Sequence, residues 1–426
     1  MQKPILLALG LLAAGPLTAQ TVTDTVSIGA GYANQVYYSL SEGPVHTAPT
    51  TNWDLAFQAN LYGAAIRANH VGGVEVYDPG VDASAWATVL DTNEADTWTA
   101  YYNADTAWET GAFDAAGWYT YQGSGLVIGT KVFALKLGDG RYKKLLIDGI
   151  TNGGSDPAYA IVFRYADVDG SNEVVDTLVK PDYATQNFIY YSLADGAVVA
   201  QEPADRATWD LVFTQYLADL GGMPYPVTGV LHNYIAAAPY GGSGTPPNVL
   251  VAEVSDVAVE EASDSGQTYA SAINTIGYDW KAFNMTKFTY DAVDSLSYFV
   301  RAMDGQVYHV AFTGFGGSAD GTFIFTKTLM RTTAADDRPG QSSLRLSVYP
   351  NPTASSAVTV AYAATEATAT LQLHDVLGRE VWSGSVTGPT ALGTYTLPSL
   401  PLRAGTYLLS MQSGTHRVSQ RVVLTP

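Results

Sequence analysis

Short runs in which apolar and polar residues alternate recur along most of the chain, separated by turns rich in glycine, proline and aspartate. Residues 131–137 (Lys-Val-Phe-Ala-Leu-Lys-Leu) are typical, and an Asp-Gly pair follows at 139–140. A period of two places every second side chain on one face of an extended strand. Helical periodicity is scarce, and one short helix is expected at residues 83–91. With 28 Tyr, 13 Phe and 41 Gly, the pattern predicts an all-β fold.

Three motifs occur twice, in the same order, within the first 330 residues. They are Tyr-Tyr-Ser-Leu at 37–40 and 190–193, Trp-Asp-Leu-x-Phe at 53–57 and 209–213, and a hairpin pattern around Asp-Gly at 133–150 and 298–315. The offset grows from 153 through 156 to 165 residues, which indicates duplication of one unit followed by loop insertions.

The duplication predicts two β modules, at residues 20–180 and 181–333, each long enough for a core of its own. The alternative is two halves of one pseudo-symmetric domain. A polar stretch at 334–343, with Asp-Asp and Pro-Gly pairs, is expected to link the modules to a C-terminal domain at 344–426.

The Trp-Asp-Leu-x-Phe motif has the spacing of a buried strand. Its Trp, Leu and Phe stand at every second position, so we expect all three on one face and the Asp on the other. The Asp-Gly pairs between alternating runs predict hairpin turns. Both motifs are therefore interpreted as scaffold.

The N-terminus has the features of a secretory signal peptide. A short basic start is followed by an apolar stretch at residues 4–17 and by the small residue Ala19, which predicts a signal peptide at 1–19 and cleavage before Gln20. No later apolar run is long enough for a membrane helix, so we expect no transmembrane segment in the mature protein.

The net negative charge of the chain comes from the residues that precede the C-terminal domain. The chain has 21 basic and 40 acidic residues, a formal charge of −19, and no cysteine. Five of the basic and three of the acidic residues fall after residue 343, which leaves 16 and 37 before it. Such acidity repels phosphate backbones, so no nucleic-acid partner is expected. Without cysteine, disulfides and thiolate chemistry are excluded.

The C-terminal domain carries three motifs in a fixed order. They are Leu-Arg-Leu-Ser-Val-Tyr-Pro-Asn-Pro at 344–352, Leu-Gln-Leu-His-Asp-Val-Leu-Gly-Arg-Glu-Val at 371–381 and Ala-Gly-Thr-Tyr-Leu-Leu-Ser at 404–410. They resemble the type A C-terminal sorting domain of the bacterial type IX secretion system. The resemblance covers about a fifth of the chain. It implies an immunoglobulin-like β-sandwich, the secretion machinery as partner, and a protein exported across the outer membrane to the cell surface or medium.

The order of motifs within each repeat is similar to the HmuY family, which are surface and secreted all-β haem-binding proteins of Bacteroidetes. The resemblance covers most of both repeats, including the closing strand at 159–165. It implies haem or porphyrin binding. Members ligate the iron through His pairs or Met-containing pairs after the Trp motif, and haem iron needs such lone-pair donors.

Candidate haem ligands follow from that resemblance. His232, His309 and Met223 lie in the second repeat and are the preferred set, whereas His70, in the first repeat, is a weaker candidate. His70 and His232 follow their tryptophans by 17 and 23 residues and are interpreted as occupying comparable places. For each histidine, a hydrogen-bonded strand residue is the alternative interpretation.

Two further groups of residues have side chains of the types that bind ligands. Asp167, Asp169 and Asn172 alternate as calcium ligands do, but the full loop spacing is missing, so a polar turn is favoured and calcium is not expected. A dense aromatic group could stack on sugar rings if exposed, or form a core if buried; it comprises Trp98, Tyr101, Tyr102, Trp108, Trp118, Tyr119 and Tyr121.

The chain lacks the motifs of common enzyme classes, with no Gly-x-Ser-x-Gly elbow, His-Glu-x-x-His pair or phosphate loop. A carboxylate pair for glycoside hydrolysis is the one enzymatic alternative left open. The sequence therefore predicts an exported binding protein for haem or porphyrin, and alternatively a surface adhesin or glycan-binding protein on the same scaffold.

Overall fold

The computed structural model describes residues 21–236, 248–331, 345–349, 353, 358–363, 368–375, 379–387, 392–398, 402–413 and 416–424. The predicted signal peptide at 1–19 and the predicted linker at 334–343 lie outside these residues. The described residues are mostly in strands, which confirms the all-β prediction.

The first lobe, lobe 1, is a sandwich of two sheets within residues 55–199. One sheet has the order β15-β14-β4-β5, formed by β4 (Leu55–Gln58), β5 (Ile66–Ala68), β14 (Phe188–Ser192) and β15 (Ala197–Val199). The other has the order β13-β12-β11-β10-β6-β7, formed by β6 (Glu75–Asp82), β7 (Thr99–Tyr101), β10 (Lys131–Lys136), β11 (Tyr142–Ile150), β12 (Ala160–Asp167) and β13 (Val174–Val179). A hairpin of β8 (Tyr119–Gly123) and β9 (Leu126–Gly129) joins it through β11.

The second lobe, lobe 2, repeats this plan with residues 21–49 and 211–331. One sheet has the order β17-β16-β2-β3, formed by β2 (Asn34–Ser39), β3 (Gly43–Pro49), β16 (Leu211–Asp219) and β17 (Pro224–His232). The other has the order β1-β23-β22-β21-β18, formed by β1 (Thr21–Ser27), β18 (Leu250–Ser255), β21 (Leu296–Arg301), β22 (Val307–Phe315) and β23 (Thr322–Arg331). The hairpin of β19 (Lys281–Asn284) and β20 (Thr289–Ala292) corresponds to β8 and β9.

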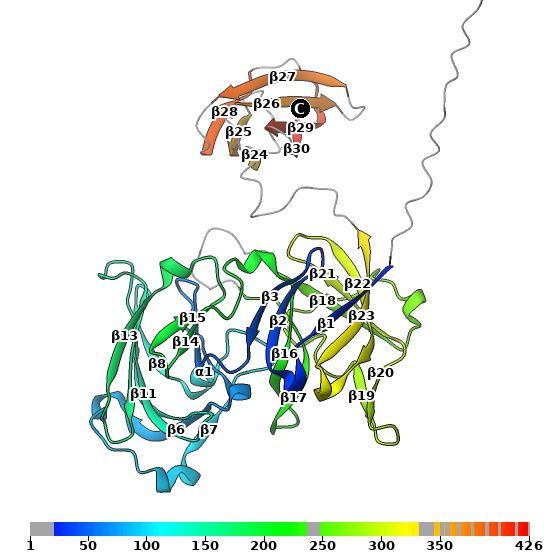
Figure 1. Ribbon diagram of the computed structural model, residues 1–426. Coiled ribbons are helices and arrows are strands. Elements are labelled where there is room, and N and C mark those ends of the chain that lie inside the picture. Colours follow the sequence, from blue (N-terminus) through cyan, green and yellow to red (C-terminus); the bar gives the residue numbers. More distant parts are fainter. Residues whose placement is uncertain are drawn as a thin grey trace, which may run out of the picture.

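The two sequence repeats exchange strands between the lobes. The Tyr-Tyr strand of the first repeat, β2, pairs with β16, which carries the second Trp motif. The Tyr-Tyr strand of the second repeat, β14, pairs with β4, which follows the first Trp. Figure 1 shows the blue N-terminal strands β1 and β2 within the lobe of yellow strands. The predicted modules, 20–180 and 181–333, therefore do not follow the two cores.

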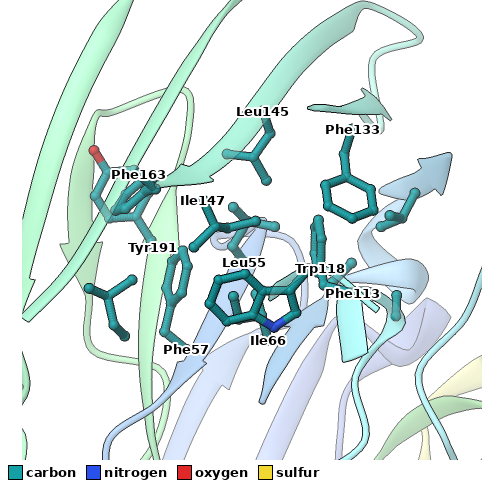
Figure 2. Close-up of a cluster of buried hydrophobic side chains, with 14 of the residues drawn as sticks. Leu55, Phe57, Ile66, Phe113, Trp118, Phe133, Leu145, Ile147, Phe163 and Tyr191 are labelled. Atoms are coloured by element: carbon teal, nitrogen blue, oxygen red, sulfur yellow. The ribbon is translucent and has the colours of Figure 1, made fainter. Parts of the chain in front are cut away.

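The core of lobe 1 joins residues of both repeats. Leu55, Phe57 and Phe163 are fully buried together with Tyr191 from the second repeat. Figure 2 shows Tyr191 beside Phe57 and Phe163, with the Trp118 indole in the middle of the cluster. Tyr191 meets Phe163 edge-on at 5.0 Å, so the exchanged strand is part of the core.

The Trp-Asp-Leu-x-Phe motif is buried as predicted, but its tryptophan does not share a face with Leu and Phe. Because β4 begins only at Leu55, Trp53 precedes the strand and turns away from the core of lobe 1 to pack against Tyr190. Trp209 does the same against Tyr37. The predicted outward Asp is also wrong, because Asp210 is buried and accepts main-chain N–H groups.

Helical structure is short in the described residues. The α-helix is α1 (Ala112–Ala116), and the remaining turns are 3₁₀: η1 (Ala30–Tyr32), η2 (His70–Gly72), η3 (Ala83–Ala85), η4 (Thr92–Thr97), η5 (Lys180–Tyr183), η6 (Arg206–Thr208), η7 (Val259–Glu261) and η8 (Gly317–Ala319). The helix expected at 83–91 is thus reduced to η3. The Asp-Gly hairpins form as predicted, with Gly140 and Gly305 at φ values of +83° and +79°.

The C-terminal domain has two antiparallel sheets around one core. They are β24 (Arg345–Tyr349), β25 (Thr359–Ala363) and β28 (Leu392–Thr396) in one sheet, and β27 (Glu380–Thr387), β26 (Thr368–Asp375), β29 (Gly405–Ser413) and β30 (His416–Leu424) in the other. Leu371, Leu409 and Met411 are buried at its centre.

Candidate functional site

The structure does not bring the preferred haem candidates together. His232 is paired with Leu211, whose side chain lies in the core of lobe 2, so the His232 ring is on the inner face of its sheet and 0% exposed. His309 is paired with Phe299 and stacks on it at 4.5 Å, on the outer face of the other sheet. Met223 is 70% exposed, between β16 and β17. The sheet that contains β21 and β22 therefore lies between the rings of His232 and His309.

His70, the weaker candidate, has both ring nitrogens engaged. Its Nδ1 lies 2.8 Å from the carbonyl oxygen of Val74, and its Nε2 lies 3.2 Å from the main-chain nitrogen of Asn103. The N–H of Asn103 donates to Nε2, so Nδ1 carries the proton and donates to Val74. Burial lowers the pKa of His70 to about 4, which keeps the ring neutral. His70 is therefore a structural residue in this conformation.

His70 and His232 are also not equivalent positions. Asn69 and Asn233 are, because each side-chain amide donates to the carbonyl oxygen of the motif tryptophan, Trp53 or Trp209. His70 follows its asparagine, whereas His232 precedes the other one. The interpretation of comparable places is therefore wrong.

The calcium candidates form a hydrogen-bonded turn between β12 and β13. The Asp167 carboxylate accepts from Lys143 at 2.7 Å and from Asn172 at 2.6 Å. Asp169 accepts the main-chain N–H and the hydroxyl of Ser171. Within the described part of the chain, no cluster of three or more His, Asp or Glu is arranged for a metal.

The aromatic group flagged by the sequence divides between core and surface. Trp118 is fully buried, and Trp108 lies between the lobes, where its indole N–H donates to the carbonyl oxygen of His232. Tyr119 and Tyr121, from β8, are 39% and 52% exposed. Trp98, between Tyr77 and Tyr142, and Tyr101 are partly buried, and Tyr102 is exposed.

The two exposed tyrosines of β8 line a cleft of about 780 Å³ in lobe 1. Tyr62 and Tyr159 contribute two more rings, which meet edge-on at 5.7 Å. Leu61, Val127 and Ile150 supply apolar surface, and residues 63–65 supply small side chains. Rings with an apolar face and a hydroxyl edge suit a ligand that is itself partly apolar and partly polar.

The turn that carries Tyr62 is held by a buried lysine on its inner side. Lys180 is 0% exposed, and its Nζ donates to the carbonyl oxygens of Asn60, at 2.9 Å, and Gly63. Burial lowers the pKa of Lys180 to about 7. Hydrogen bonds within the protein therefore hold this wall of the cleft in place.

Two carboxylates complete the lining. Asp114, in α1, accepts the N–H groups of Ile66 and Gly111, both at 2.9 Å, and burial raises its pKa to about 6. Glu109 accepts the N–H of Ala236, which brings a segment after β17 to the rim. Among the described residues that line the cleft there is no Lys, Arg or His.

The sequence flagged Tyr119 and Tyr121 but missed Tyr62, Tyr159, Glu109 and Asp114. These four come from separate loops and a short helix, and no motif links them. A signal existed only for Tyr62, which stands between the Asn60 and Gly63 turn residues that separate two apolar runs.

The C-terminal domain has an independent assignment. Residues 347–425 match the family model described as a secretion system C-terminal sorting domain. This segment is a sorting domain. The sorting domain implies export by the type IX system, and therefore a secreted or cell-surface location with the secretion machinery as a partner. No helix in the described residues is both long enough and apolar enough to span a membrane.

None of the curated proteins matches the chain. Among solved structures, the chain is similar to a biofilm-associated protein BSP domain, at 10% identity over 100% of this chain and 84% of that one, with a TM-score of 0.16. It is also similar to PorZ, a surface component of the type IX secretion system of Porphyromonas gingivalis, at 13% identity over 78% and 41%, with a TM-score of 0.16. Similarities this weak carry no argument about fold or function.

Proposed function

We propose that this exported protein binds carbohydrate in the tyrosine-lined cleft of lobe 1. The carrying observation is the presence of four tyrosine rings, Tyr62, Tyr119, Tyr121 and Tyr159, around one open cleft. Sugar rings have an apolar face of C–H groups and an edge of hydroxyls. Tyrosine matches both, because its ring is apolar and its hydroxyl donates and accepts hydrogen bonds.

The protein acts as a binding protein rather than an enzyme in this proposal. Asp114 is the buried carboxylate of the cleft, but one of its oxygens is already taken up by two main-chain N–H groups at 2.9 Å. Glu109 is bound to the main chain of Ala236. Both carboxylates therefore help to hold the walls of the cleft, and the proposal assigns neither of them a proton transfer.

Haem or porphyrin binding remains a prediction of the HmuY resemblance, and the geometry gives it less support. His232 is enclosed in the core of lobe 2, and His309 lies on the outer face of the opposite sheet. Ligation of one iron by this pair would require the two rings to approach a single porphyrin plane from opposite sides. A haem titration of the full mature chain that gave a saturable, red-shifted Soret band, lost in His232→Ala or His309→Ala, would favour haem instead.

The carbohydrate proposal is tested by screening the full mature chain against immobilised oligosaccharides. Tyr121→Ala should abolish whatever binding the wild type shows. Tyr225→Ala is the matched control, because Tyr225 is exposed to a similar extent, 58% against 52%, but lies on lobe 2. Equal binding by wild type and Tyr121→Ala would contradict the proposed site, and no binding to any oligosaccharide would contradict the function.

A further inference from the structure

Because the lobes are duplicated, lobe 2 contains residues equivalent to those that line the cleft of lobe 1. The β8–β9 hairpin pairs Tyr119 with Gly129, and the β19–β20 hairpin pairs Lys281 with Ala292. Each hairpin follows a buried tryptophan whose carbonyl oxygen accepts an N–H at 2.8 Å from the residue after the hairpin, Thr130 or Val293. The two hairpins are therefore equivalent, and Lys281 stands where lobe 1 has Tyr119.

In lobe 2 the space that corresponds to the cleft of lobe 1 is occupied by side chains of the protein. The ammonium of Lys281 lies 4.4 Å from the ring centroid of Trp280 and 4.7 Å from that of Phe315. It donates to the carbonyl oxygens of Thr228, at 2.5 Å, and Tyr278, at 3.1 Å. Lobe 2 thus holds a lysine amine between aromatic rings and main-chain oxygens, and burial lowers the pKa of this amine to about 7.

The corresponding residues of lobe 1 line the cleft. Strand register places Val127 at the position of Tyr290, because each is paired with the third residue of its hairpin's first strand, Tyr121 or Phe283. Ile150 ends β11 after a bulge, as Phe315 ends β22. Smaller aliphatic side chains replace two aromatic rings in lobe 1, which accounts for the space of the cleft.

The lining of the cleft is acidic, as a site for a cation requires. Glu109 and Asp114 are its charged residues. The buried cations behind it are committed to carbonyl oxygens: Arg67 donates to Ala104 and Ala107 at 2.9 and 2.8 Å, and Lys180 donates to the Tyr62 turn. Neither cation lines the cleft.

We infer that the cleft of lobe 1 takes a carbohydrate bearing free amino groups, whose sugar rings and ammonium occupy the space that aromatic rings and Lys281 fill in lobe 2. This inference rests on the proposed function and specifies its ligand class. The sugar rings stack on Tyr119 and Tyr121, and an ammonium faces Glu109 and Asp114. Anionic sugars are disfavoured by the same carboxylates.

The test compares three tetrasaccharides with the same β-1,4 linkage, made of glucosamine, N-acetylglucosamine or glucose. Each is titrated calorimetrically into the full mature chain at about pH 6.5, where a fraction of the free amines is charged and most of the Asp114 carboxyl, whose pKa is about 6, is still ionised. The glucosamine tetramer should bind at least about tenfold more tightly than the other two, the size expected for one added charged hydrogen bond. Equal or tighter binding of the N-acetylated or glucose tetramer would overturn the inference and leave the proposed function standing.

The acidic chain attracts any polycation, so the site is checked with a variant of unchanged charge. Val127→Tyr combined with Ile150→Phe gives the cleft the side chains of lobe 2 and should abolish binding. If the double variant does not fold, Glu109→Gln is used instead; it changes the net charge by only one and should weaken binding of the glucosamine tetramer about tenfold without affecting the two neutral tetramers. Undiminished binding of the glucosamine tetramer by these folded variants would show attraction by net charge and overturn the inference. If none of the three tetrasaccharides binds, the inference is overturned, and the wider screen then decides the proposed function.

Discussion

The phenol oxygens of Tyr37 and Tyr190 lie 3.5 Å apart in the buried interior between the two lobes. The two residues occupy the same position in the two sequence repeats. Their surroundings match, because Trp209 meets Tyr37 edge-on at 4.9 Å and Trp53 meets Tyr190 edge-on at 5.0 Å. A contact between equivalent residues places both beside an approximate two-fold axis that relates the lobes.

The strand exchange predicts which fragments fold. Residues 51–200 contain both sheets of lobe 1 and should fold alone. Residues 20–180 lack β14 and β15, which supply Tyr191 to the core, and should not. Circular dichroism and amide NMR spectra of the two fragments decide this. A dispersed spectrum from 20–180 and a collapsed one from 51–200 would contradict the exchange.

The buried carboxylate of Asp210 should be a major source of stability. It accepts the N–H groups of Leu40 and Met303, both at 2.7 Å, and so ties two distant segments together. Asp210→Ala leaves both donors buried without an acceptor and should lower the free energy of unfolding by about 3 kcal/mol or more. Urea denaturation measures the loss, and Asp82→Ala, at an exposed position, is the control that should change little.

Trp209 is expected to matter far more than a surface tryptophan. It is 1% exposed and packs against Tyr37, so Trp209→Ala should lower the free energy of unfolding by about 3–5 kcal/mol. Trp98 is only partly buried, so Trp98→Ala should lower the free energy of unfolding by less. Thermal denaturation of Trp209→Ala that matched the wild type would refute this prediction.

Glu202 should make stability fall as the pH rises. Burial raises its pKa from 4.5 to about 8, so between these values the folded protein keeps a proton that the unfolded chain has lost. The free energy of unfolding then decreases with pH across this window, by up to about 1.4 kcal/mol per unit.

Glu202→Gln isolates this effect. The glutamine oxygen can still accept the N–H groups of Asn187 and Phe188, but it does not titrate. Urea denaturation from about pH 4.5 to pH 8 should show a smaller decline for Glu202→Gln than for the wild type. The exposed Glu94→Gln is the control, and parallel pH profiles for all three proteins would rule out the role of Glu202.

The strands, the Asp-Gly turns and the duplication could be predicted because each is encoded locally. The sequences of β2 and β14, which are buried on both faces along most of their length, indicate strands but do not specify the partner strand. Pairing with the near or the distant Trp motif therefore leaves the same pattern in the sequence. The exchange depends on contacts such as Tyr191 with Phe163, which no local signal encodes.

The candidate site was only partly visible for the same reason. Tyr119 and Tyr121 stand in a dense aromatic stretch, but the cleft beside them depends on two aliphatic residues, Val127 across the hairpin and Ile150 at the end of the neighbouring β11. Tyr159 joins them only through the folding of the β11–β12 connection. The sequence positions of His232 and His309 did not reveal that the two rings face different layers.

The most direct test of the account is a crystal structure of the full mature chain with the oligosaccharide that binds best in the screen. The account predicts sugar rings stacked on Tyr119 and Tyr121, with Tyr62 and Tyr159 at the opposite wall of the lobe 1 cleft. Sugar density confined to another surface, with this cleft unchanged, would contradict it.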